Sequence, residues 1–176
     1  EDYGIGIPLR NSRVVIPFEN LKNKYNYEET DLNYFNELTI DDLSLCHTKE
    51  FVDKVNGDPE SVVLATYELV NSDGSYNRFD PKLAKKPLTD FIAKGMLHVN
   101  GTFLAAKNAL ENGFCYHLGG GMHHAMSHRP GGFCMFSDIV IAIRKLQKLG
   151  KIKNALVIDM DAHKGDGTAQ ITCADN

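Results

Sequence analysis

The segment from Ala155 to Thr168, ALVIDMDAHKGDGT, is the feature that most constrains the fold of this chain. Its first four residues, Ala155–Ile158, are all apolar and two of them are β-branched, which is the composition of a buried β-strand. Glycines lie near the end of the segment, and they predict a turn after the strand. The sequence therefore predicts a buried strand that leads directly into a polar, glycine-containing loop.

Three side chains that can bind metals follow this strand at a spacing of two: Asp159, Asp161 and His163. Because side chains of a strand alternate between its faces, all three would point the same way if the backbone stayed extended. Divalent metals such as zinc bind carboxylate oxygen and imidazole nitrogen together. The pattern indicates a metal site. On these residues alone, an ordinary polar loop after a hydrophobic strand remains the alternative.

A second cluster, GGGMHH, lies upstream at residues 119–124 and contains the adjacent His123 and His124. It follows a short apolar run, Phe114–Leu118. Three glycines allow the backbone to turn tightly and to approach another segment or a ligand closely. In a parallel sheet both clusters would lie at the carboxyl ends of strands, where α/β proteins place their sites. Taken alone, the two histidines are equally consistent with exposed loop residues.

Strand and helix patterns alternate along the second half of the chain, which favours an α/β fold with a parallel sheet flanked by helices on both faces. Near the amino end, Arg13–Ile16 is a strand candidate that Pro17 ends. Capping residues and apolar periodicity predict the helices, and small polar residues predict the turns. The remaining predicted elements are a loop with a short helix at Tyr25–Asn36, helices at Thr48–Val55, Pro59–Val70 and Thr89–Asn112, a turn at Asn71–Ser75, and a helix capped by Ser137 and ended by Gly150.

The composition excludes several classes of protein. A chain of 176 residues with 43% hydrophobic and 24% charged residues is typical of one globular domain. Its net charge of −4 gives no electrostatic reason to expect nucleic-acid binding. No apolar run approaches the ~20 residues that span a bilayer. The four cysteines are scattered without a C-x-x-C pair, which predicts reduced thiols in a cytoplasmic protein.

From about Gly119 to Thr168 the chain resembles the zinc-dependent deacetylase family, which comprises histone deacetylases and acetylpolyamine amidohydrolases. The resemblance rests on four motifs that match in order, spacing and residue type: GGGMHHA, PGGFC at 130–134, FSD at 136–138 and IDMDAHKGDGT. Cys46–Phe51 is a weaker match near the amino end. The resemblance implies the arginase/deacetylase fold. It also implies that residues 1–176 are the amino-terminal portion of a single deacetylase-like domain, which this chain leaves incomplete.

The activity implied by the resemblance is that of a metal-dependent hydrolase that removes acyl groups, notably acetyl, from lysine or polyamine-type amines. Asp161 and His163 match two of the three protein ligands of the family's metal. The implied metal is zinc, with ferrous iron as the alternative. Backbone carbonyls around Asp159, Asp161 and His163 would also form part of a potassium site.

The resemblance implies proton-transfer roles for His123 and His124, as base and acid beside an activated water. Hydrolysis of an amide requires a polarised carbonyl, an activated water and a proton for the leaving amine. A paired imidazole must also be held in one tautomer and orientation, which a carboxylate behind it achieves. Asp159 and Asp166 match the family positions that do this for His123 and His124 respectively.

Gly132 and Phe133 match the wall of a narrow acyl-lysine tunnel in the family. On the sequence alone, a glycine-rich turn with one buried aromatic is an equal alternative. The family's third metal ligand and its oxyanion-stabilising tyrosine would both follow Asn176. The chain is therefore expected to associate with the remainder of the domain, or to form a homo-oligomer through its exposed face.

Two other functions compete with a deacetylase. An arginase-like ureohydrolase would share the fold, but it has a second aspartate two residues after the histidine, where this chain has Gly165. Asp166 comes three residues after His163, out of register with a shared strand face. The other alternative is a catalytically incomplete deacetylase-like protein that binds acylated ligands or a partner.

Overall fold

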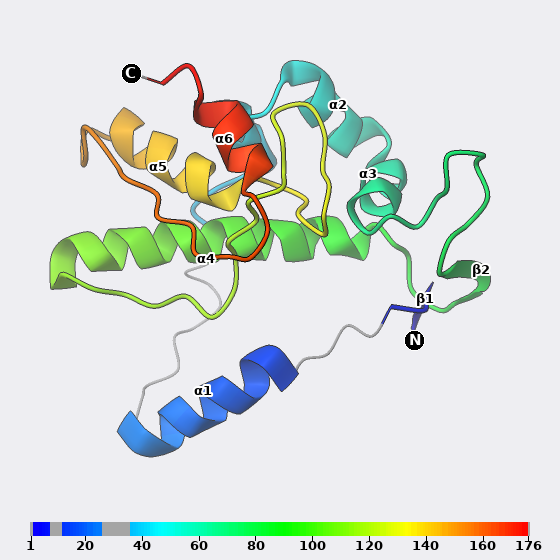
Figure 1. The fold of residues 1–176 in the computed structure, drawn as a ribbon, viewed down its shortest axis with the longest axis horizontal. Helices are drawn as coiled ribbons and strands as arrows, with labels where there is room; N and C mark the ends of the chain where they lie inside the picture. Colours follow the sequence, from blue (N-terminus) through cyan, green and yellow to red (C-terminus); the bar gives the residue numbers. More distant parts are fainter. Residues whose placement is uncertain (1, 8–11, 26–35, 176) are drawn as a thin grey trace.

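The structure is a computed structural model that describes residues 2–7, 12–25 and 36–175. Helices dominate it, and α4 runs the length of the main body with α5, α6 and α2 on one side (Figure 1). The only sheet in the described residues is small and lies beside the amino-terminal end of α4. The elements are β1 (Tyr3–Ile5), α1 (Ser12–Tyr25), the 3-10 helix η2 (Ile40–Leu45), α2 (Lys49–Gly57), α3 (Pro59–Thr66), β2 (Phe79–Ala84), α4 (Asp90–Asn112), α5 (Asp138–Lys148) and α6 (Asp166–Thr172).

The hydrophobic core lies between α4 and α5 and extends under η2, α2 and α3. Phe103 of α4, Phe136 before α5 and Ile141 of α5 are almost completely buried in it. Gly95 allows the close approach at the centre, because a Cβ there would lie 2.9 Å from the ring of Phe136. This packing joins α4 to α5, the two helices that precede and follow the histidine cluster in the chain. No helix in the described part of the chain is long and apolar enough to cross a membrane.

The four helices predicted to begin near Thr48, Pro59, Thr89 and Ser137 are confirmed, with differences at their ends. The short helix predicted within Tyr25–Asn36 falls mostly outside the described residues. Thr48 caps α2, since its hydroxyl accepts a hydrogen bond from the Phe51 amide at 3.3 Å. Gly113 ends α4 in the left-handed conformation, with φ of +84°. The helix predicted over Pro59–Val70 ends earlier, at Thr66. Ser137 precedes α5, but its side chain makes no capping hydrogen bond, which corrects that prediction.

The sheet differs from the prediction. Strands β1 and β2 pair antiparallel, with Tyr3 opposite Ala84, and no parallel sheet occurs among the described residues. The strand predicted at Arg13–Ile16 was wrong, because these residues belong to helix α1. A run of only three apolar residues, Val14–Ile16, is compatible with either element, and here the helical residues that follow it extend the helix back over the run. Most of the loop predicted over 25–36 lies outside the described residues.

The two apolar runs next to the site, Phe114–Leu118 and Ala155–Ile158, form no strands. Phe114 is 76% exposed, Leu156 84% and Ile158 74%, so the buried strand predicted at Ala155–Ile158 is wrong in this structure. The second of these runs is the orange trace between α5 and α6 in Figure 1. An apolar strand is buried only when neighbouring strands supply hydrogen bonds and cover, and no described segment pairs with either run.

His47 joins two loops of the core. It is 4% exposed, and its Nε2 accepts a hydrogen bond from the Ser137 amide at 3.1 Å. This contact places the ring proton on Nδ1, which donates to the Ser127 carbonyl at 3.3 Å. Desolvation lowers the pKa of His47 from 6.5 to about 4, so the ring is neutral at pH 7. The loops before α5 and after the two adjacent histidines are therefore connected by one uncharged ring.

This arrangement predicts a loss of stability in mild acid. Above pH 6.5 the ring is neutral in both the native and unfolded states. As the pH falls from 6.5 towards 4, the unfolded chain binds a proton that native His47 does not, so the free energy of unfolding should fall by about 3 kcal/mol in total. Urea unfolding at several pH values would measure this slope. The slope should be shallower in His47→Gln, which keeps one donor and one acceptor but cannot titrate; an unchanged slope would contradict the assignment.

Candidate active site

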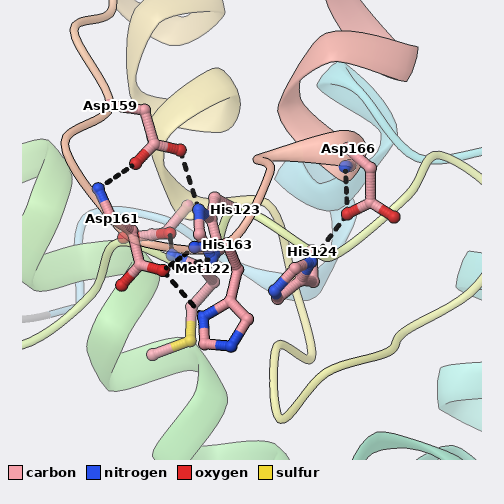
Figure 2. Close-up of polar contacts among 9 residues, drawn as sticks. Met122, His123, His124, Asp159, Asp161, His163 and Asp166 are labelled. Carbon is pink, nitrogen blue, oxygen red and sulfur yellow. Dashed lines mark hydrogen bonds and ion pairs between the residues drawn. The ribbon is translucent and has the colours of Figure 1, made fainter.

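The structure brings the two histidines of the GGGMHH cluster against the aspartates predicted as their partners. His123 Nδ1 lies 2.7 Å from Asp159 Oδ2, and His124 Nδ1 lies 2.6 Å from Asp166 Oδ1 (Figure 2). The two rings are adjacent, with centroids 4.2 Å apart. In each pair the carboxylate accepts the Nδ1 proton, which leaves Nε2 as the lone-pair nitrogen. Both rings are therefore oriented for proton transfer at Nε2.

The hydrogen bonds also keep the two carboxylates ionised. The hydrogen bond from His123 holds the pKa of Asp159 below its usual range, and that from His124 does the same for Asp166. An ionised carboxylate accepts a hydrogen bond but cannot donate one, so it fixes the tautomer of the ring it faces. Each carboxylate therefore fixes the orientation of the ring that it faces.

Asp161 and His163 lie together beside these pairs. Asp161 Oδ1 accepts a hydrogen bond from the His163 amide at 2.8 Å and lies 2.9 Å from His163 Nδ1. The same oxygen is 4.0 Å from His123 Nε2, and the rings of His124 and His163 are 6.0 Å apart. Hydrogen bonds from the backbone and side chain of His163 lower the pKa of Asp161. An anionic oxygen and an imidazole nitrogen therefore converge next to the histidine pair.

These two donors are of the type that zinc binds, and they fit a metal as part of a larger ligand set. Within the described ranges, no group of three or more His, Cys, Asp and Glu side chains is arranged to hold a metal ion. In the segment after Ile158, side chains accept hydrogen bonds from nearby amides, and the strand expected there does not form. Asp159 Oδ1 accepts from the amide of Asp161 at 3.0 Å, and Asp161 repeats this with His163.

Two glycines allow the 159–168 segment to press against the histidines. A Cβ at Gly165 would overlap the Asp159 carboxylate, and one at Gly167 would lie 2.5 Å from the Ala125 carbonyl oxygen. The amide of Thr168 donates to the His123 carbonyl at 3.0 Å. The first turn of α6 therefore packs on the backbone of the histidine pair with no side chain between them.

Gly132 and Phe133 lie on the other side of His124. A Cβ at Gly132 would lie 2.6 Å from His124 Cδ2, so the glycine is in direct contact with the ring. Both residues have positive φ, +52° and +64°, and the Phe133 side chain is partly exposed. The Phe133 ring lines a cavity of about 280 Å³ with Met122 and Tyr67. This placement suits an aromatic wall near the histidines better than a buried core residue.

The sequence interpretation missed the residues beneath the glycine loop. Asp138 was named only within the FSD motif, and His98 was given no role. In the structure Asp138 is fully buried and accepts hydrogen bonds from the amides of Gly121 and Met122, and His98 Nδ1 accepts from Gly120. The apolar residues that precede Asp138 were the available signal, because an acid inside an apolar run needs buried donors.

Comparisons with known proteins agree with this arrangement. The family model described as histone deacetylase domain matches residues 7–176. The acetoin utilization protein AcuC of Bacillus subtilis is 31% identical over 172 residues, which is 96% of this chain and 42% of that protein. Histone deacetylase 2 of Arabidopsis thaliana is 46% identical over 69 residues, 39% of this chain and 18% of that protein. A probable deacetylase of Methanothermobacter thermautotrophicus is 42% identical over 76 residues, 43% and 23% of the two chains.

The chain spans less than half the length of each of these curated relatives. No solved structure matches it. The family match covers nearly the whole chain, including every residue of the candidate site, and it implies the arginase/deacetylase fold. The chain belongs to the histone deacetylase family.

Proposed function

We propose that this chain carries part of the active site of a metal-dependent deacetylase. The observation that supports it best is the pair of neighbouring His–Asp contacts, His123 with Asp159 and His124 with Asp166, beside the convergent oxygen and nitrogen donors of residues 161 and 163. Membership of the histone deacetylase family supports hydrolytic deacetylation as the type of reaction.

In this proposal Asp161 and His163 are two ligands of a divalent metal, which is zinc or, alternatively, ferrous iron. When bound, the metal supplies Lewis-acid polarisation of the amide carbonyl and lowers the pKa of a water molecule. Backbone carbonyls around Asp159, Asp161 and His163 would contribute to a potassium site. The oxygen and nitrogen donors of Asp161 and His163 support the divalent site, because zinc binds both atom types.

The two histidines move the protons. Nε2 of one ring removes a proton from the attacking water, and Nε2 of the other delivers a proton to the leaving amine nitrogen. Asp159 and Asp166 stabilise the rings in the required tautomer and the imidazolium when it forms. The amine is that of an acylated lysine or polyamine, and its methylene chain would pass along Gly132 and Phe133.

A second candidate is a binding protein that recognises acylated ligands or a partner without turning them over. The observation that favours it is that the donors at 161 and 163 belong to no group of three or more side chains arranged to hold a metal ion among the described residues. An arginase-like reaction is less consistent with the chain, because Gly165 occupies the position of its bridging aspartate.

We also propose a cytoplasmic location. The four cysteines are free thiols, which supports it.

We further propose that the remainder of a deacetylase domain, or a second copy of the chain, covers the exposed run at 155–160. Leu156, Ile158 and Met160 all face solvent, and an open groove of about 720 Å³ lies between this run, α5 and α6. Exposed apolar edges favour association. The remainder would also supply a third metal ligand and the oxyanion tyrosine.

The expected result is that the 176-residue chain alone hydrolyses little or no acetyl-lysine with added zinc, whereas a longer protein that contains it is active. The measurements are a fluorogenic acetyl-lysine assay on both proteins and the mass of each in solution. A stable monomer of the short chain with robust zinc-dependent turnover would contradict the proposed incompleteness. A longer protein with bound metal and no turnover would favour the binding protein instead.

A further inference from the structure

The loop that carries His123 and His124 is held by a carboxylate that the proposed chemistry does not use. Asp138 opens α5 and is fully buried. Its Oδ1 accepts a hydrogen bond from the Met122 amide at 2.7 Å, and its Oδ2 accepts one from the Gly121 amide at 2.9 Å. Both amides lie immediately before the histidine pair. The carboxylate therefore fixes the peptide groups that lead into it.

Thr102 of α4 holds this carboxylate in place. Its hydroxyl donates to Asp138 Oδ2 at 2.5 Å, and the hydroxyl oxygen lies 3.2 Å from His117 Nδ1, from which it accepts. Burial lowers the pKa of His117. A buried carboxylate is costly unless its oxygens accept hydrogen bonds. Here two amides and one hydroxyl donate hydrogen bonds to the carboxylate, and the positive end of the α5 dipole stabilises its charge further.

The glycine loop is built around this contact. Gly120 has φ of +74°, and a Cβ there would overlap both Asp138 Oδ2 and Thr102 Oγ1. Gly121 has nearly the same φ, +76°, but a Cβ there would meet nothing within 4 Å. The same backbone conformation therefore occurs at two neighbouring glycines, and a side chain would collide with the carboxylate only at the first.

We infer that Asp138 is a positioning residue, which acts through the amides of Gly121 and Met122 to hold His123 and His124 against their own carboxylate partners. Displacement of a catalytic group by ~1 Å can lower a rate by about 10²-fold. The kinetic consequence rests on the proposed function, whereas the order of the loop can be measured without turnover.

The test compares Asp138→Asn and Thr102→Val with the matched control Thr102→Ser, in the longer, active protein. Asparagine replaces one hydrogen-bond-accepting oxygen of Asp138 with an NH2 group, which can only donate. Valine removes the hydroxyl while keeping the shape of Thr102. We expect Asp138→Asn to lower kcat ~10-fold or more with KM changed by less than ~2-fold, and Thr102→Val to lower it less. Thr102→Ser keeps the hydroxyl and should retain kcat.

Amide hydrogen exchange at Gly121 and Met122 measures the order of the loop independently of catalytic activity. Exchange should accelerate ~10-fold in Asp138→Asn, the loss expected for a hydrogen bond to a charged acceptor, and Thr102→Ser should exchange as the wild type does. Unchanged exchange in Asp138→Asn, or equal losses of kcat in the two Thr102 variants, would overturn the inference. If the wild-type protein shows no turnover, the proposed function fails and the exchange data still decide the positioning role.

A second pair of variants tests the inference if Asp138→Asn does not fold. Gly120→Ala and Gly121→Ala both place alanine at a positive φ, +74° and +76°, so the backbone strain is matched in the two variants. Only the alanine at position 120 collides with Asp138. Faster exchange at Met122 in Gly120→Ala than in Gly121→Ala supports the inference, and equal exchange in the two contradicts it.

Discussion

Replacing His123 or His124 with alanine should lower turnover by ~10²-fold or more, with a much smaller effect on substrate binding. The reason is that each ring has one nitrogen committed to a carboxylate and the other left to accept or deliver a proton. Alanine removes the proton carrier and leaves the aspartate solvated. Steady-state kinetics of acetyl-lysine hydrolysis by the longer protein would measure kcat and KM separately.

His128→Ala is the matched control for this experiment. His128 lies on the same loop, four residues after His124, but its side chain faces solvent. It should keep turnover near the wild-type value. Asp159→Asn and Asp166→Asn should lower kcat as well, because asparagine accepts one hydrogen bond without stabilising an imidazolium. Near-normal turnover in both histidine variants would mean that the pair is structural.

Asp161→Asn and His163→Ala should each weaken zinc binding by ~10²-fold or more, because loss of a direct ligand costs at least as much as loss of an outer partner. Asparagine keeps the shape of Asp161 and the acceptor for the His163 amide, so the change isolates the carboxylate charge. Competition with a chromophoric chelator measures the affinity without reference to catalysis.

The control for the metal experiment is again His128→Ala, which removes an exposed imidazole from the loop that carries His123 and His124. It should bind zinc as the wild type does. If Asp161→Asn and His163→Ala both retained the wild-type metal content, the assignment of these residues as ligands would be wrong. The histidine pair could then still be tested by its kinetics.

The helices were predictable because their signals are local. Thr48, Gly113 and the apolar periodicity between Asp90 and Asn112 each act within one or two turns of the residue concerned. The meeting of His123 with Asp159 joins residues 36 apart, and only the resemblance to a known family pointed to it. Local propensity carries no information about such a contact.

The strands could not be predicted, because strand formation also depends on contacts between distant segments. Ala155–Ile158 has the composition of a buried strand, but burial requires a neighbour on each side, and that depends on segments far away in the sequence. The environment of Asp138 is a similar case. Its donors come from α4 and from the glycine loop, so the residues next to the acid in the sequence do not reveal them.

The absence of a side chain at Gly167 has a consequence for protein engineering. Because the first turn of α6 touches the backbone at Ala125 directly, the two segments are matched in shape at the level of main-chain atoms. A chimera that takes residues 119–125 from one homologue and 165–168 from another would have to reproduce that fit. No side chain lies between the two segments, so a change of rotamer could not correct a mismatch. The two segments should therefore be transplanted as one cassette, and directed evolution of either one alone should return glycine at position 167.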